Sequence, residues 1–167
     1  MSEAEQAGWL VQLEKHSRQQ GSGISQKDLA GSWRLVDVWD RQARPRGGQA
    51  RLLQGLQARL EIGPEQPPGV PHPEACALEL RNSVRLGALA LMFQGPGWLE
   101  GRRPLLRFRF ELISFSLGRR LLWQQGLPAP AQGGGPFFAL IATGNDEQGR
   151  WLLARGRGGG LARWRCP

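Results

Sequence analysis

The clearest alternation of apolar and polar residues lies between Gly101 and Leu122, in the stretch GRRPLLRFRFELISFSLGRRLL. A period of two is typical of a strand with one buried and one solvated face. The parity changes after Leu112, and a bulge near that residue would reconcile the two halves. We therefore predict one long, bent strand, as closing a sheet into a barrel requires. Its apolar positions are Phe108, Phe110, Leu112, Ile113, Phe115 and Leu117.

Similar patterns predict further strands on both sides of this stretch. Ala50–Ile62 is ambiguous because its leucines also fit a helix, and we favour a strand interrupted at Gly55. Gly95-Pro96-Gly97 and Gly118-Arg119 are predicted to be turns. The other predicted strands are Ser32–Asp40, Ala75–Phe93 with a bend at Gly87, Leu121–Gln124, Phe137–Thr143, Trp151–Ala154 and Leu161–Trp164.

The N-terminal segment has a different pattern. Ala4–Gln20 contains no proline and carries a narrow apolar stripe, which predicts a surface helix or lid. A short helical turn follows at Ser25–Ala30. Gly63–Glu74 holds five prolines and is predicted to be an exposed loop, and Gly126–Gly135 is a low-complexity spacer. The stripe consists of Trp9, Leu10 and Leu13.

These elements predict a mainly β fold, an antiparallel barrel of about eight strands with a short N-terminal helix. A length of 167 residues fits one domain, and 24 glycines and 12 prolines favour many tight turns. We expect residues 1–24 to form the helix and its linker, and residues 25–167 to form the barrel domain.

The longest apolar run, Ala88–Phe93, is far too short to span a bilayer as a helix. The acidic N-terminus lacks the basic head and apolar core of a secretory signal. We therefore expect a cytoplasmic protein without a signal peptide or a transmembrane helix.

The net charge of +8 belongs entirely to the second half of the chain. Up to Gly101 there are eleven basic and eleven acidic residues, whereas the remainder has eleven basic and only three acidic ones. Arginine supplies twenty of the 22 basic residues, and its planar fork binds carboxylates and phosphates. Either this half docks on an acidic partner or anionic surface, or the arginines form a solvated outer face. The candidate partner-binding residues are Arg102, Arg103, Arg107, Arg109, Arg119 and Arg120.

No catalytic motif is present, and the carboxylates are scattered, so we expect no enzymatic activity and no catalytic residues. Cys76 and Cys166 are expected to be reduced thiols, and with only His16 and His72 beside them we expect neither a metal site nor a cofactor. The segment from Arg155 to Gly160, RGRGGG, is single and framed by apolar strands. It therefore favours a hairpin turn over an RGG-type tail, and nucleic-acid binding is disfavoured.

Gly31-Ser32-Trp33 at the start of the first strand resembles the G-x-W element of lipocalin-like barrels. From Leu29 to Trp164 the order of segments resembles the plastid-lipid-associated protein, or fibrillin, family of cyanobacteria and chloroplasts. The segments that carry this resemblance are LAGSWRLVDVW, LQGLQARLEI, LELRNSVRLG, LLRFRFELISFSL and WLLARGRGGGLARW.

The resemblance implies a lipocalin-like barrel that binds a lipid, prenylquinone or carotenoid-like molecule near thylakoids or lipid globules. It also implies that Trp33 plugs one end of the barrel beneath Arg155 or Arg163, and that Asn82 matches a family asparagine. The arginine excess and the proline-rich insertion depart from the family pattern. For the ligand-binding lining we nominate Trp33, Leu89, Leu91, Phe108, Phe110 and Phe115.

Three functions follow from these expectations. The first is non-enzymatic binding or sequestration of an apolar small molecule near photosynthetic membranes. The second is a scaffold or assembly factor whose basic half docks on a peripheral thylakoid membrane or an acidic protein. The third is the chromophore handling of a related bilin lyase.

Overall fold

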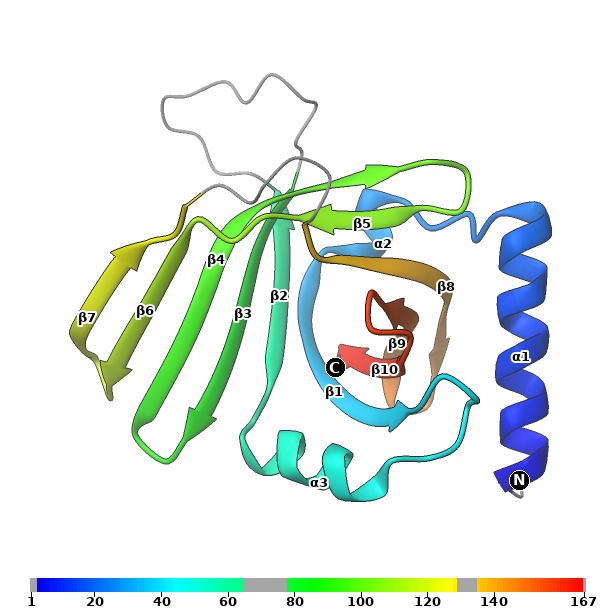
Figure 1. Cartoon of the computed structure of the whole chain (residues 1–167), viewed down its shortest axis with the longest axis horizontal. Coiled ribbons are helices and arrows are strands. Elements are labelled where there is room, and N and C mark those ends of the chain that lie inside the picture. Colours follow the sequence, from blue (N-terminus) through cyan, green and yellow to red (C-terminus); the bar gives the residue numbers. More distant parts are fainter. Residues whose placement is uncertain (1–2, 65–77, 129–134, 167) are drawn as a thin grey trace.

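The computed structural model describes residues 3–64, 78–128 and 135–166. It is mainly β, with eight antiparallel strands closed into a barrel and a helix at the N-terminus (Figure 1). The predicted fold class is therefore confirmed. The strands are β1 Gly31–Trp39, β2 Arg59–Pro64, β3 Leu78–Leu86, β4 Leu89–Glu100, β5 Leu105–Phe108, β6 Leu112–Leu117, β7 Arg120–Gly126, β8 Phe137–Asp146, β9 Gly149–Gly156 and β10 Leu161–Cys166. The helices are α1 Glu3–Gln20, α2 Gln26–Leu29 and α3 Gly47–Gly55.

The barrel runs β1–β2–β3–β4–β5–β8–β9–β10 and closes where β10 pairs with β1. Two more strands, β6 and β7, lie outside this circuit. The first part of β4, Leu89–Gln94, pairs with β6, whereas its last part, Gly97–Glu100, pairs with β5. The sheet therefore forks along β4. One branch closes the barrel, and the other forms an open sheet beside it (Figure 1). We call this open sheet, Asn82–Leu86 of β3, Leu89–Gln94 of β4, β6 and β7, the flank.

The fork lies at Gly95-Pro96-Gly97, where we predicted a turn. That prediction is wrong, because β4 continues through all three residues. A Cβ atom at Gly95 would overlap the carbonyl group of Arg109, which shows how closely the chain after β5 crosses β4. The Arg109 amide donates to the Pro96 carbonyl at 3.0 Å. A glycine is therefore needed at position 95, where two backbones cross closely.

The predicted long strand from Gly101 to Leu122 is also divided. β5 ends at Phe108 and β6 begins at Leu112, with three irregular residues between them. Barrel closure requires β5 to pair with β8, whereas β6 pairs with β4 and β7 in the flank. The change after Leu112 in which alternate residues are apolar therefore marks the point where the chain passes from the barrel to the flank, and not a bulge within one strand. The turn at Gly118-Arg119 is confirmed, as is the RGRGGG turn between β9 and β10.

The segment Ala50–Ile62 contains a helix, so the favoured strand is wrong for its first half. α3 ends at Gly55, and only Arg59 and the residues after it pair with β1. Beyond Arg34, β1 pairs with β10 but not with β2, so residues before Arg59 lie beside β1 without forming a strand ladder with it. Local helical hydrogen bonds satisfy their backbone instead.

The predicted N-terminal helix is confirmed as α1, which packs on the outer face of the barrel against β8. Leu10 is fully buried in a second apolar cluster with Trp39, Ile141 and Leu153. The buried Ser17 hydroxyl donates to the Leu140 carbonyl at 3.3 Å. Helix α1 therefore belongs to the packed domain. The predicted loop at Gly63–Glu74 and Cys76 fall largely or wholly outside the described residues.

Candidate functional site

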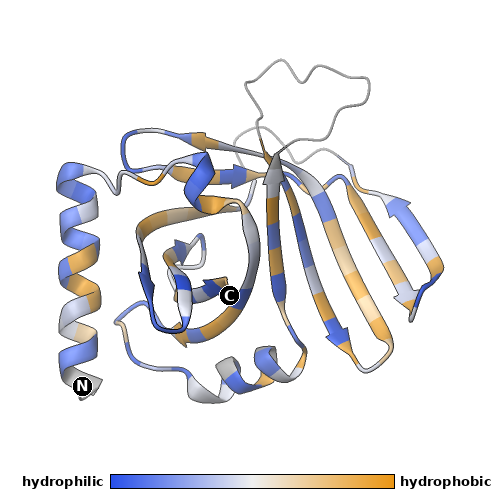
Figure 2. Cartoon of the chain, turned by 180° about the vertical axis from the view of Figure 1, so that it is seen from behind, coloured by the Kyte–Doolittle hydropathy of each residue, from blue (hydrophilic) through white to orange (hydrophobic). Residues whose placement is uncertain are grey.

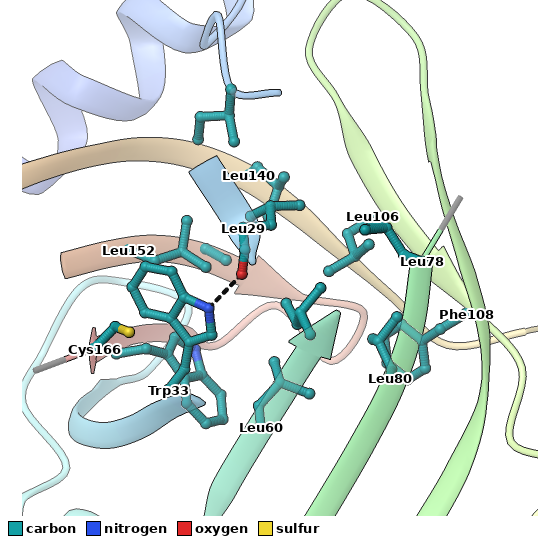
Figure 3. Packing of buried hydrophobic residues seen from close by; sticks show 14 of the residues in the cluster. Leu29, Trp33, Leu60, Leu78, Leu80, Leu106, Phe108, Leu140, Leu152 and Cys166 are labelled. Atoms are coloured by element: carbon teal, nitrogen blue, oxygen red, sulfur yellow. Dashed lines mark hydrogen bonds between the residues drawn. The ribbon is translucent and has the colours of Figure 1, made fainter. Parts of the chain in front are cut away.

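Trp33 is fully buried near the barrel end where β1 begins and β10 ends. Its indole Nε1 donates to the carbonyl of Leu29, the last residue of α2, at 2.6 Å (Figure 3). The guanidinium of Arg150 lies 5.2 Å from the centre of the indole ring. Arg150 also donates to the carbonyl of Ala30 at 2.7 Å, which holds the guanidinium in place.

The prediction that Arg155 or Arg163 covers Trp33 is therefore wrong. Arg163 binds the carboxylate of Asp37 on the neighbouring strand at 2.7 Å. Arg155 reaches α1, where its Nε and Nη2 atoms bind the two oxygens of Glu14 at 2.8 and 2.6 Å. The register explains this, because Arg150 lies near the start of β9, opposite Cys166, and Arg155 lies near the other end of the same strand.

Glu14 gathers three arginines from three parts of the chain. Besides Arg155, it accepts from Arg18 of its own helix at 2.9 Å and from Arg103 of the β4–β5 turn at 3.1 Å. The residue is only 7% exposed. Burial alone would raise the pKa of Glu14, but hydrogen bonds and charge from Arg155 and Arg18 outweigh it and lower the pKa to about 2. This cluster anchors α1 to the barrel.

The interior of the closed barrel is filled by side chains that pack on one another (Figure 3). Trp33 and Phe108, both predicted to line a ligand site, belong to this packed core. They stabilise the barrel, and the structure does not expose them to an open surface. Other members are Leu29, Leu35, Leu60, Ile62, Leu78, Leu80, Leu106, Leu140, Leu152 and Trp164.

The inner face of the barrel continues onto the flank. On β3, Leu78 and Leu80 face the core, and every second residue after them stays on the same side of the sheet. Strand pairing extends this side across the flank in rows of directly opposed residues. The row nearest the core is Asn82, Phe93, Ile113 and Gln125. The middle row is Val84, Leu91, Phe115 and Trp123, and the outer row is Leu86, Leu89, Leu117 and Arg120.

This apolar face is open on the flank. The exposed fraction of the residue is 64% for Leu86, 40% for Leu89, 46% for Leu117 and 47% for Trp123. Apolar residues recur along the strands of the flank in Figure 2. β7 is exposed over its whole length. A contiguous apolar surface of this kind typically marks a binding site in a monomeric protein.

A row of aromatic rings joins the flank to the core. Phe93 lies 5.5 Å from Phe110, and Phe110 lies 5.1 Å from Phe108. The row continues to Phe138 at 5.3 Å and to Trp164 at 6.2 Å. Phe110 is half-buried and therefore sits at the boundary between the packed barrel and the open face.

Of the predicted ligand residues, the structure brings Leu89, Leu91 and Phe115 together on this face, with Phe110 at its inner border. Sequence reasoning missed Leu86, Leu117 and Trp123 as candidates. The hairpin turn at Gly118-Arg119 could have indicated Leu117 and Trp123, because it places β6 opposite β7. Asn82 lies half-buried on the same side of the sheet, between Leu60 of β2 and Phe93.

The six predicted partner-binding arginines are dispersed. Arg107 pairs with Glu100 and Arg109 with Glu111, while Arg103 belongs to the Glu14 cluster. Arg102, Arg119 and Arg120 are exposed. The last two lie at the tip of the β6–β7 hairpin, directly beside the apolar face.

Within residues 3–64, 78–128 and 135–166, no three His, Cys, Asp or Glu residues cluster as a metal site. Cys166 is a free, buried thiol. Among the helices of the described segments, none has the length and apolar character to cross a membrane. Comparisons with protein-family models, curated proteins and solved structures gave no match to this chain. The resemblance to the fibrillin family therefore stays a prediction.

Proposed function

We propose that this protein binds or sequesters an apolar small molecule, such as a lipid, prenylquinone or carotenoid-like compound, without catalysing a reaction. The binding surface is the inner face of the flank. The observation that carries the proposal is the continuity of this exposed face with the barrel core through Leu91, Phe115 and the Phe93–Phe110 contact. The ligand would extend the core outward over the flank.

The physical driving force is the burial of apolar surface. Leu86, Leu89, Leu117 and Trp123 each leave 40% or more of their surface in water. Full burial of a side chain of this size contributes roughly 1.5–3 kcal/mol, so covering the exposed part of several of them offsets much of the cost of association. The filled core supports this site, because the interior of the barrel is already packed while several large apolar side chains of the flank remain exposed.

The resemblance to the fibrillin family supports a cytoplasmic role beside photosynthetic membranes as part of this proposal. The scaffold alternative relies on the basic half, but Arg103, Arg107 and Arg109 are held by carboxylates of the same chain. Chromophore handling of the bilin lyase type remains a separate hypothesis. Bilin absorbance after coexpression with a chromophore would distinguish it.

The direct test is mass spectrometry of organic extracts from protein purified from its own cells. We expect one apolar compound to copurify with the wild type and to be lost from the double variant Leu89→Ser, Leu117→Ser. Val11→Ser is the matched control, since Val11 is comparably exposed on α1, away from the flank. Equal recovery of the compound from all three proteins, or none from the wild type, would contradict the proposal.

A further inference from the structure

We infer that the molecule bound on the flank is an anionic amphiphile, an acyl chain that ends in a carboxylate or a comparable acidic group. This inference rests on the proposed function and narrows the class of ligand. It is carried by the position of Arg120 on the same face as the exposed leucines, and by the lack of a carboxylate partner for it among residues 3–64, 78–128 and 135–166.

The register places Arg120 at the rim of the apolar face. Arg120 pairs with Leu117, Leu117 pairs with Leu89, and Leu89 pairs with Leu86. Directly opposed residues of antiparallel strands point to the same side of the sheet. The outer row therefore consists of three leucines and one arginine, and Arg119 stands next to it in the turn.

The strand segments that form this rim carry basic residues but no acidic ones. The sequence has no acidic residue from Leu80 to Leu99 or from Leu112 to Pro128. In the described part of the chain, no carboxylate pairs with Arg119 or Arg120, in contrast to Arg107 and Arg109. Two guanidinium groups that no described carboxylate binds, beside exposed leucines, complement a molecule with an acidic head and an apolar tail.

The dimensions of the face suit such a molecule. From Leu89 in the outer row to Phe93 in the inner row is four residues of β4, a length of about 13 Å. An acyl chain along β4 would place its head group at Arg120 and its tail against Phe93 and Phe110. A neutral quinone or carotenoid would cover the same leucines but would gain nothing from the arginines.

The test compares two probes of equal chain length, dodecanoate and 1-dodecanol, by isothermal titration calorimetry below their aggregation limits. We expect the wild type to bind dodecanoate at least about tenfold more tightly, the contribution of a charge-assisted hydrogen bond. The double variant Arg119→Gln, Arg120→Gln should lose this preference and bind both probes alike. Arg44→Gln, Arg46→Gln is the matched control on an exposed loop of the barrel and should keep the wild-type preference.

The possible results separate this inference from the proposed function. Equal binding of both probes by the wild type would overturn the inference and leave apolar binding intact. Failure of both probes to bind would overturn both. A third arm uses sedimentation with vesicles of neutral or anionic phospholipid. If Arg119 and Arg120 are required for binding anionic vesicles but not for binding dodecanoate, they serve a bilayer surface and the inference is wrong.

Discussion

Arg155 of β9 binds both carboxylate oxygens of Glu14 in α1, a contact that joins residues 141 positions apart in the sequence. Arg18 and Arg103 complete the shell around the same carboxylate. The pair ties the N-terminal helix to the last third of the barrel. This ion pair helps to fix the position of α1 on the barrel, whereas exposed residues of the helix such as Val11 make no such contact.

Replacing Glu14 by Gln should destabilise the fold by about 3 kcal/mol, because removal of the carboxylate leaves the half-buried guanidinium groups of Arg155 and Arg103 without compensation. Urea unfolding followed by circular dichroism measures this change. Glu147→Gln, in the exposed β8–β9 turn, should shift the midpoint little. Equal midpoints for the two variants would show that the Glu14 cluster does not anchor the helix.

The same carboxylate should make the stability depend on acid. The pKa of Glu14 is about 2 in the folded protein, against a usual value of 4.5. A lowered pKa contributes stability that is fully present above about pH 4.5 and is lost as the pH falls towards 2. The difference in melting temperature between wild type and Glu14→Gln should therefore shrink across this range. A difference that stays constant down to pH 2 would contradict the assignment.

Trp33→Phe should destabilise the barrel by about 1–3 kcal/mol, because it removes the donor to the Leu29 carbonyl and leaves a buried acceptor unpaired. Arg150→Gln tests the cover above the indole and should have a smaller effect of the same sign, together with a change in tryptophan fluorescence. Arg163→Gln serves as the comparison, since Arg163 pairs with Asp37. If Arg163→Gln changed the fluorescence and Arg150→Gln did not, the cover would be misassigned.

Gly95→Ala should destabilise the fold by about 2 kcal/mol or more, because the new methyl group overlaps the backbone carbonyl of Arg109. Gly48→Ala is the control within α3. A Cβ atom there meets no neighbour within 4 Å, and the substitution should stabilise the helix by roughly 0.5–1 kcal/mol. Thermal unfolding of both variants gives the comparison. If Gly95→Ala left the melting temperature unchanged, β4 would not fork at this residue.

Local patterns were sufficient for most of the elements. Helix α1, the strand β1 and the hairpin turns at Gly118-Arg119 and in RGRGGG all follow from residues close in sequence. The failures share one physical cause. Gly95-Pro96-Gly97 has turn composition, but its conformation depends on the backbone of Arg109, which crosses it. Likewise α3 forms because β2 begins pairing with β1 only at Arg59.

The candidate site was predicted in part for a similar reason. Alternation along β4 and β6 identified Leu89, Leu91 and Phe115 as residues of one buried or binding face. It could not distinguish them from Phe108, because burial depends on which strands close the barrel and which remain open. The partner of Trp33 was missed because Arg150 and Arg155 lie on the same strand, and only the register of β9 against β10 distinguishes them.

The sequence by itself determined most of the strands, the apolar and polar sides of each and the concentration of arginine in the second half, since these depend on the identity and order of neighbouring residues. Only the tertiary structure decided which strands pair with one another. The fork along β4 divided Gly101–Leu122 between a filled barrel and an open flank. Side-chain alternation records which side of a strand is apolar, but it contains no information on which strand lies beside it. Long-range pairing of β4 with β6 therefore placed Leu89 beside Leu117 on one exposed face.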